Sequence, residues 1–204
     1  WHTLLSRRRE KGMDSPKVRI GYAITGSFCT FSKTFEAMKR LVARDYELTP
    51  IMSYNAYELS TRFGTSAQNR EMATAITGKA IIHTIRDAEP IGPKRMFDIF
   101  VVAPCTSNTL AKLACGINDT PVTMAVKSHV RNMRPVVIAV STNDALAAAA
   151  ANIGALQAAK NYYFVPYGQD DYLIKPYSMV ADFGMMERTG ELALSGVQIQ
   201  PMIV

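Results

Sequence analysis

One segment, residues 98–119, constrains the fold of this chain more than any other. It begins with a β-branched and aromatic run at 99–103, which Pro104 is expected to end, and four small or polar residues at 105–108 follow. Apolar residues then recur at helical spacing within 110–114. The pattern predicts a buried strand, a polar turn and a helix. In open α/β sheets, ligands bind just outside the carboxyl ends of such strands.

Apolar runs of strand length alternate with helical patterns along the rest of the chain. Strands are expected at 18–24, 47–52, 81–83, 135–140 and, as the last of them, 162–165; helices are expected at 32–44, 122–126, 145–160 and 190–195. This alternation predicts an α/β protein with a parallel sheet covered by helices on both faces, a three-layer Rossmann-like fold.

The domain organisation is simple, because no repeat or linker divides residues 13–204. We expect those residues to form a single domain. Residues 1–12 precede Met13 and have no counterpart in the strand and helix pattern. We expect them to be a disordered leader or a remnant of cloning.

Charge and composition exclude several classes of protein. Residues 1–12 supply +3 of the formal net charge of +6, and the remaining +3 is too mild to predict nucleic-acid binding. No apolar run reaches the length of a membrane span, and we expect no secretory signal. The three cysteines and three histidines match no zinc or redox spacing. We therefore expect a reduced, cytoplasmic protein without a metal site.

Four of the predicted strands end in small, polar residues. These ends are 25–27, 53–55, 105–109 and 141–143. Any one of them could be a helix cap, since Ser, Thr and Asn are common caps. Parallel strands, however, bring their carboxyl ends to one edge of the sheet. Four polar ends at one edge favour a shared ligand site.

The first of these turns indicates what kind of ligand would fit. Residues 21–27 read Gly-x-x-x-x-Gly-Ser, which is not the Gly-x-Gly-x-x-Gly dinucleotide fingerprint, and no Walker lysine follows. Gly26 and Ser27 would still let the backbone approach one phosphate, with the Ser27 and Thr30 hydroxyls as donors. The turn predicts a mononucleotide, or a phosphorylated or carboxylated small molecule, rather than NAD.

Residues 104–119 resemble the Pro-Ala-Ser-Ala-Asn-Thr, Lys and Gly-x-x-Asp signature of the FMN-binding flavoproteins. That family includes phosphopantothenoylcysteine decarboxylases, lantibiotic peptide decarboxylases and flavin prenyltransferases. The resemblance covers residues 18–160 and implies the flavoprotein fold, a homo-oligomer and FMN as the candidate cofactor. It implies a set of cofactor-binding residues: Gly26, Ser27, Thr30, Ser53, Pro104, Thr106, Ser107, Asn108, Thr109, Thr142 and Asn143.

Within this set, the resemblance implies a division of roles. Gly26, Ser27 and Thr30 would hold the phosphate end of FMN. The residues at 107–109 would hold the ring and ribityl edge. Ser53 and Thr142 would complete the cleft.

Further segments resemble a narrower group within that family, whose members pair with a nicotinamide-binding subunit to oxidise a lysine-pathway intermediate to an aromatic dicarboxylate in sporulating bacteria. These segments are 61–64, 88–94, 131–137, 141–146, 166–171 and 175–180. The resemblance implies an oxidoreductase subunit of the mother-cell cytoplasm, with NAD(P) on its partner. The alternative is a non-catalytic subunit that binds a small molecule or stabilises that partner.

A cysteine decarboxylase is the third alternative, and the sequence departs from that pattern. The decarboxylases carry a histidine a few residues before the motif strand, whereas residues 89–98 contain none. Their Pro-x-Met-Asn segment is replaced here by residues 141–143. Without the usual acid/base partner, we do not expect cysteine decarboxylation.

A dicarboxylate substrate would need cations, and guanidinium suits carboxylate through its bidentate geometry. The candidates are Arg62, Lys112 and Arg131. Arg62 follows the second strand in the segment Thr-Arg-Phe-Gly and is expected to reach the pocket. The alternative for each cation is an exposed surface charge. The pattern indicates no catalytic residue.

Overall fold

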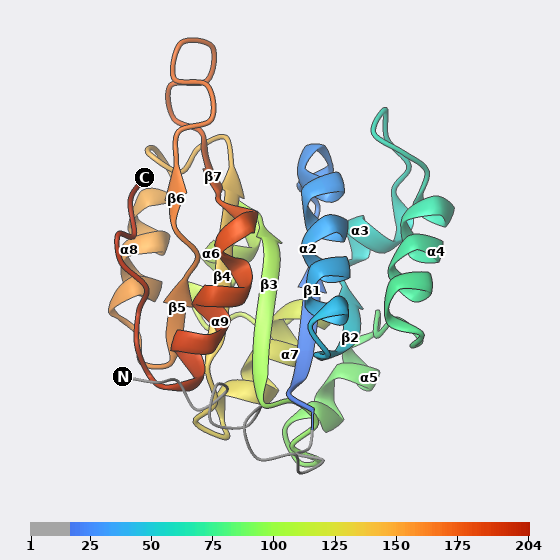
Figure 1. The fold of residues 1–204 in the computed structure, drawn as a ribbon. Coiled ribbons are helices and arrows are strands. Elements are labelled where there is room, and N and C mark those ends of the chain that lie inside the picture. Colours follow the sequence, from blue (N-terminus) through green and yellow to red (C-terminus); the bar gives the residue numbers. More distant parts are fainter. Residues whose placement is uncertain (1–16) are drawn as a thin grey trace.

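The structure, a computed structural model, describes residues 17–204, and these form one seven-stranded sheet with helices on both faces (Figure 1). The strands are β1 (Arg19–Ile24), β2 (Glu47–Met52), β3 (Ile99–Cys105), β4 (Val136–Thr142), β5 (Tyr162–Phe164), β6 (Tyr167–Gly168) and β7 (Met179–Ala181). They lie in the order β2-β1-β3-β4-β7-β6, and β5 also pairs with β4. Because β1 to β5 pair in parallel, the predicted α/β fold is confirmed.

Two layers of helices cover this sheet. The α-helices are α2 (Phe31–Ala43), α3 (Tyr54–Glu58), α4 (Ser66–Thr77), α5 (Ile85–Ala88), α6 (Ser107–Ala114), α7 (Pro121–Val130), α8 (Ala150–Ala158) and α9 (Met186–Leu194). The short 3-10 helices are η1 (Phe28–Thr30), η2 (Glu89–Ile91) and η3 (Phe183–Met185). In Figure 1, α2 and α9 lie in front of the sheet, and α6 and α7 lie behind it.

The central strands form the core. Every residue of β3 is buried, and its β-branched and aromatic side chains suit a strand that is covered on both faces. Gly21 on β1 lies directly against this strand, since a Cβ there would come within 2.6 Å of the Phe97 and Phe100 rings. The close packing of β1 on β3 therefore depends on the missing side chain.

The sequence pattern predicted that Pro104 ends the motif strand, and this prediction is wrong. β3 continues through Cys105, which pairs with Val140 of β4 after a shift in register. Proline lacks an N–H, so it is tolerated in a strand where the ladder is irregular. The carboxyl end of β3 therefore lies closer to α6 along the chain than expected.

Several predicted boundaries differ in smaller ways. Helix α2 begins at Phe31, with Thr30 rather than Ser32 at its N-cap. The segment predicted as a strand at 81–83 contributes one parallel bridge, between Ile82 and Ile51 of β2. Helix α8 begins at residue 150 rather than 145, because turns occupy the preceding residues. Gly116 follows α6 with φ +69°, the left-handed position predicted for it.

The C-terminal tail adds an antiparallel edge that the pattern did not predict. β7 pairs with Ser141 and Thr142 of β4 and also with β6. β4 therefore pairs with β5 along its first half and with β7 along its last two residues. The expectation that the strand at 162–165 is the last is wrong. Strands of two or three residues are too short to display a period of two.

The amino ends of the strands are held by charged side chains. Asp98 accepts hydrogen bonds from the Arg19 backbone N–H and guanidinium, at 3.0 Å each, and pairs with Arg134 at 3.1 Å. Burial opposes ionisation of Asp98, but these arginine contacts outweigh it and lower its pKa. This edge is thus a structural clamp, and it lies opposite the predicted ligand site.

Among residues 17–204, no helix is both long enough and apolar enough to cross a bilayer. The expectation of a leader at residues 1–12 falls outside the described residues. The predicted domain, 13–204, is described from residue 17 onward.

Candidate functional site

The end of β1 is bonded to the turn that follows β3. The Thr25 hydroxyl donates to the Pro104 carbonyl at 2.7 Å, and the Thr106 backbone N–H donates to the Thr25 hydroxyl oxygen at 3.1 Å. Thr25 is 1 % exposed. These bonds fix the position of the polar turn before α6.

The end of β1 also contacts the end of β4. The hydroxyl oxygens of Ser27 and Ser141 lie 2.8 Å apart, and Ser141 donates to the Thr30 hydroxyl at 3.4 Å. The Thr30 hydroxyl in turn donates to the Ser27 carbonyl at 2.8 Å. Three hydroxyls from two strand ends therefore gather at one point.

The third part of the site is the N-terminus of α6. The Thr106 and Thr109 hydroxyls lie 3.2 Å apart, and Ser107 and Asn108 stand between them in the first turn. Thr106, the N-cap, makes no side-chain hydrogen bond to the backbone amides of the helix. Those N–H groups lack the side-chain acceptor that usually satisfies a helix start.

Helices α2 and α8, which follow β1 and β4, also begin without a side-chain cap. By contrast, Ser53 caps α3, and capping boxes begin α4 and α7. Of the four α-helices that begin without a side-chain cap in residues 17–204, α2, α6 and α8 follow the three central strand ends, and α9 follows η3. Uncapped N–H groups and the positive end of a helix dipole favour an anionic ligand.

Gly26 lies between these groups and the end of β2. A Cβ at Gly26 would be 3.5 Å from the Asn55 Cβ, in ordinary contact. Asn55 belongs to α3, whose N-cap Ser53 accepts from the Ala56 N–H at 3.3 Å. The Ser53 hydroxyl, predicted to line the cleft, is thus engaged as a helix cap, and Asn55 is the residue beside Gly26.

Two predicted residues at the end of β4 have other partners. The Thr142 hydroxyl bonds to Asp144, and Asn143 accepts from the Ser178 hydroxyl at 3.4 Å. Successive side chains of a strand point to opposite faces, so Thr142 cannot share the direction of Ser141. Ser141, rather than Thr142, contacts the serine and threonine of the β1 end.

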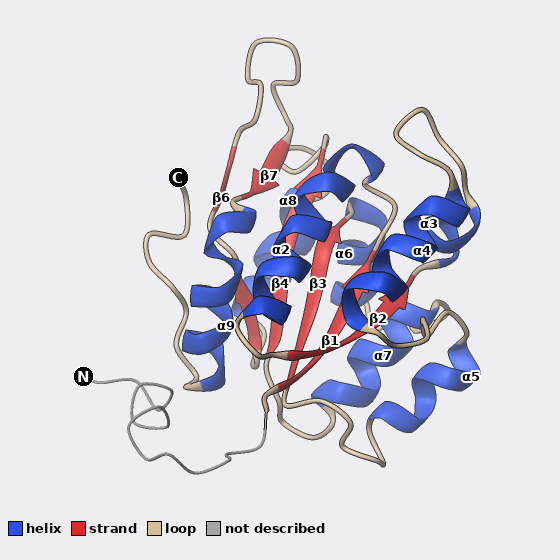
Figure 2. Ribbon diagram, turned by 45° about the vertical axis from the view of Figure 1, so that its right-hand side comes forward, coloured by secondary structure: helices blue, strands red, loops and turns tan. Residues whose placement is uncertain are grey.

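The three cations predicted for a substrate lie apart. Lys112 on α6 pairs with Asp119 at 2.7 Å. Arg62 is exposed on the loop between α3 and α4, with its guanidinium 4.9 Å from the Phe63 ring centroid. Arg131 ends α7 and precedes β4, at the amino edge of the sheet. Of the three, only Arg62 belongs to the loop between α3 and α4, and Figures 1 and 2 show this loop projecting beyond the carboxyl edge of the sheet.

Thr25 and Ser141 are the residues that sequence reasoning left out of the site. Both belong to the polar strand ends that the pattern identified. Period-two alternation along β4 could have selected Ser141 over Thr142. Thr25 gave no such signal, because its bonds to the β3 end depend on the register between two distant strands.

The chemistry of the gathered groups is that of binding rather than of proton transfer. The cluster offers hydroxyls, one amide and backbone N–H groups. Cys105 ends β3 beside it, fully buried, and burial raises the pKa of its thiol. A thiol of raised pKa is a poor nucleophile at neutral pH.

Comparison with known proteins identifies the relatives of this chain. The family model described as "Flavoprotein" matches residues 8–193. The B subunit of dipicolinate synthase from Bacillus subtilis (strain 168) is 43 % identical over 186 residues, which cover 91 % of this chain and 93 % of that protein. The crystal structure of the corresponding B subunit from Bacillus halodurans superposes with a TM-score of 0.85 at 39 % identity, covering 94 % of this chain and 98 % of that one.

A more distant structure shares the fold alone. The FMN-dependent cysteine decarboxylase SpaF superposes with a TM-score of 0.67 at 24 % identity, over 87 % of this chain and 97 % of that one. The family model and the match along nearly the whole length of the synthase protein establish the relationship. The chain belongs to the flavoprotein family, and within it is a homologue of the B subunit of dipicolinate synthase.

Proposed function

We propose that this chain is the B subunit of a dipicolinate synthase and takes part in oxidising a dihydrodipicolinate-level intermediate of the lysine pathway to dipicolinate. The observation that carries the proposal is the 43 % identity to a synthase subunit over 93 % of that subunit's length. The partner would be the A subunit of the synthase, which would bind NAD(P). The complex would act in the mother-cell cytoplasm of a sporulating bacterium, with this chain as a homo-oligomer.

The donor set at the carboxyl edge suits FMN. A phosphate needs hydroxyl and N–H donors, and Ser27, Thr30 and Ser141 would supply three hydroxyls near the start of α2. The first turn of α6, with Ser107, Asn108 and Thr109, would face the ring and ribityl edge. When bound, FMN would supply a hydride acceptor.

The residues of this chain would hold the α6 turn in place and would bind and orient the substrate. The buried Thr25 hydroxyl would hold the α6 turn at a fixed distance from the β1 end. Arg62 would receive a substrate carboxylate from the projecting loop, because its guanidinium is stacked on Phe63 and exposed. A bidentate contact of this kind orients a carboxylate as well as binding it.

One observation favours a second candidate function, a non-catalytic subunit that binds a small molecule or stabilises the synthase's A subunit. The hydroxyl and amide cluster contains no carboxylate, imidazole or amine; of the two thiols beside it, Cys105 is buried and the exposed Cys29 lies 3.9 Å from the Ser27 hydroxyl. In this role the chain would alter the affinity or assembly of its nicotinamide-binding partner without taking part in electron transfer.

The test is an absorbance spectrum and FMN titration of the purified chain, alone and with its synthase partner. The flavin proposal expects a flavin spectrum or tight FMN binding that Asn108→Ala weakens at least tenfold. Synthase activity of the reconstituted complex should depend on FMN and fall in the Arg62→Ala variant. Failure of FMN to bind in either state, with activity intact, would favour the non-catalytic role.

A further inference from the structure

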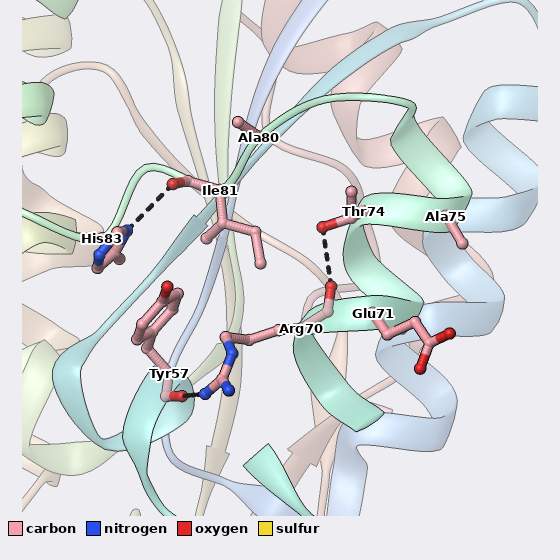
Figure 3. Close-up of a pocket in the computed structure, with 8 residues that line it drawn as sticks. All are labelled: Tyr57, Arg70, Glu71, Thr74, Ala75, Ala80, Ile81 and His83. Atoms are coloured by element: carbon pink, nitrogen blue, oxygen red, sulfur yellow. Dashed lines mark hydrogen bonds between the residues drawn. The ribbon is translucent and has the colours of Figure 1, made fainter. Parts of the chain in front are cut away.

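A second group of chemically active side chains lies beyond the β2 edge, away from the hydroxyl cluster. It lines an open groove of about 580 Å³ between α3, α4 and the segment that bridges to β2 (Figure 3). Its lining residues are Tyr57, Arg70, Glu71, Thr74, Ala75, Ala80, Ile81 and His83. A volume of this size is typical of small-molecule sites.

Three of these side chains form a fixed stack. The His83 and Tyr57 rings are parallel within 5°, with centroids 3.9 Å apart. The Arg70 guanidinium lies 4.8 Å from the Tyr57 centroid and donates to the Tyr57 carbonyl at 2.6 Å. Figure 3 shows the Tyr57 ring between the other two side chains. The guanidinium is thus oriented before any ligand arrives, which lowers the entropy that binding would cost.

The charge of Arg70 is not neutralised. Within residues 17–204, no carboxylate lies within ion-pair distance of it. Glu71 is its neighbour in the chain, but Figure 3 shows the Glu71 carboxylate pointing away from Arg70. A guanidinium has five N–H donors, and the Tyr57 carbonyl uses one of them. The remaining donors are available to an anion.

The rest of the lining restricts the class of anion. Ile81, Ala75 and Ala80 form an apolar wall, and Figure 3 shows the Ile81 side chain extending toward Arg70 and Tyr57. A phosphate is usually held by several cations or by a helix N-terminus, whereas this groove has one arginine. One planar cation beside an apolar wall matches a carboxylate on an apolar body.

We propose that this groove binds a small carboxylate of that kind, with its carboxylate on the Arg70 guanidinium and its apolar body against Ile81. The Tyr57 hydroxyl, which has no hydrogen-bond partner within residues 17–204, is a further donor at the rim. The proposal concerns the β2 edge alone and does not rest on the FMN site or on the synthase reaction.

The test is a ligand-observed NMR titration of the full chain with benzoate, and separately with inorganic phosphate. The matched variants are Arg70→Gln and Arg86→Gln, which make the same change of charge; Arg86 is exposed on α5 and does not line the groove. We expect Arg70→Gln to weaken benzoate binding at least tenfold and Arg86→Gln to change it less than twofold. Arg70→Lys keeps the positive charge but loses the planar guanidinium with its paired N–H donors, and should weaken benzoate binding at least threefold.

Melting temperatures of all three variants report whether each protein still folds. If Arg70→Gln does not fold, Arg70→Lys still tests the contribution of the guanidinium to benzoate binding. Equal loss of benzoate binding in Arg70→Gln and Arg86→Gln would overturn the proposal, because general charge would then explain it. Absence of benzoate binding would overturn it as well. Phosphate binding stronger than benzoate binding would overturn the carboxylate assignment.

Discussion

The hydroxyl oxygens of Ser27 and Ser141 lie 2.8 Å apart, although 114 positions separate the two residues in the chain. One follows β1 and the other lies at the end of β4, on opposite sides of β3. Their contact therefore spans the centre of the sheet at its carboxyl edge. A ligand bound there would contact both strand ends at once.

The alternation along β4 predicts unequal effects of neighbouring substitutions. Ser141→Ala removes a hydroxyl that contacts Ser27 and Thr30, whereas Thr142→Ala removes one that bonds to Asp144. We expect Ser141→Ala to weaken FMN binding about 10-fold to 150-fold, because one hydrogen bond to a charged group contributes about 1.5–3 kcal/mol. Fluorescence titration of FMN against both variants measures the difference. Equal losses of FMN affinity in the two variants would contradict the assignment of Ser141, rather than Thr142, to the FMN site.

The buried Thr25 hydroxyl is expected to matter for stability. Thr25→Val keeps the shape of the side chain but leaves the Pro104 carbonyl and the Thr106 N–H without their partner. An unsatisfied buried group costs about 1–3 kcal/mol, so the free energy of unfolding should fall by that amount. Urea denaturation measures it, and Thr25→Ser, which retains the hydroxyl, is the control. A loss of equal size in the serine variant would mean that packing, not hydrogen bonding, is responsible.

Two glycines predict opposite results for the same substitution. Gly21→Ala would place a Cβ within 2.6 Å of two buried phenylalanine rings, and overpacking of this kind costs about 1–3 kcal/mol. Gly154→Ala lies in α8, where a Cβ meets nothing within 4 Å, and should stabilise the protein by about 0.5–1 kcal/mol. Thermal unfolding of both variants compares the signs. Destabilisation by Gly154→Ala would contradict this explanation.

His129 predicts a loss of stability in mild acid. Burial lowers its pKa to about 4, against the partly opposing hydrogen bond to the Pro135 carbonyl. The unfolded chain has the ordinary value of about 6.5. As the pH falls, the unfolded chain takes up the His129 proton at a higher pH than the folded protein does. The contribution of neutral His129 to the free energy of unfolding is therefore fully present above pH 6.5 and falls by about 3 kcal/mol as the pH drops to 4.

The His129→Gln variant tests that assignment. Its amide can still donate to the Pro135 carbonyl but does not titrate, so its unfolding free energy should depend less on pH between 6.5 and 4. Urea denaturation across that range, for the variant and the unmodified chain, gives the two slopes. Equal slopes would assign the loss of stability to other groups, such as the Asp98 carboxylate at lower pH.

The parallel core of this fold could be predicted from sequence because its strands are continuous apolar runs. β2 occupies 47–52 as expected, and the polar turn after β3 leads into a helix as expected. The contacts of the β1 end with the ends of β3 and β4 followed from the rule that parallel strands share one carboxyl edge.

What the sequence could not provide depends on contacts between distant residues. β7 is a strand because Val180 pairs with Ser141, and nothing in its three residues indicates that pairing. Helix α3 has five residues, too few to display a helical period. The face of the sheet to which the Thr142 side chain points could be predicted only from the exact register of β4, because a shift of one residue moves a side chain to the opposite face.

The outer strands of this sheet have few free backbone groups, which limits aggregation through strand addition. β2 contains Pro50, which offers no N–H to another chain, and Ile82 covers the backbone of its last residues. On the other side the sheet ends in two short strands. One is the two-residue β6, whose Tyr167 already exchanges hydrogen bonds with Met202 and Val204, and the other is the three-residue β5, where the Gln198 side chain bonds to the N–H and carbonyl of Phe164. Neither side presents a long row of free backbone groups, so strand addition from another molecule has little to pair with.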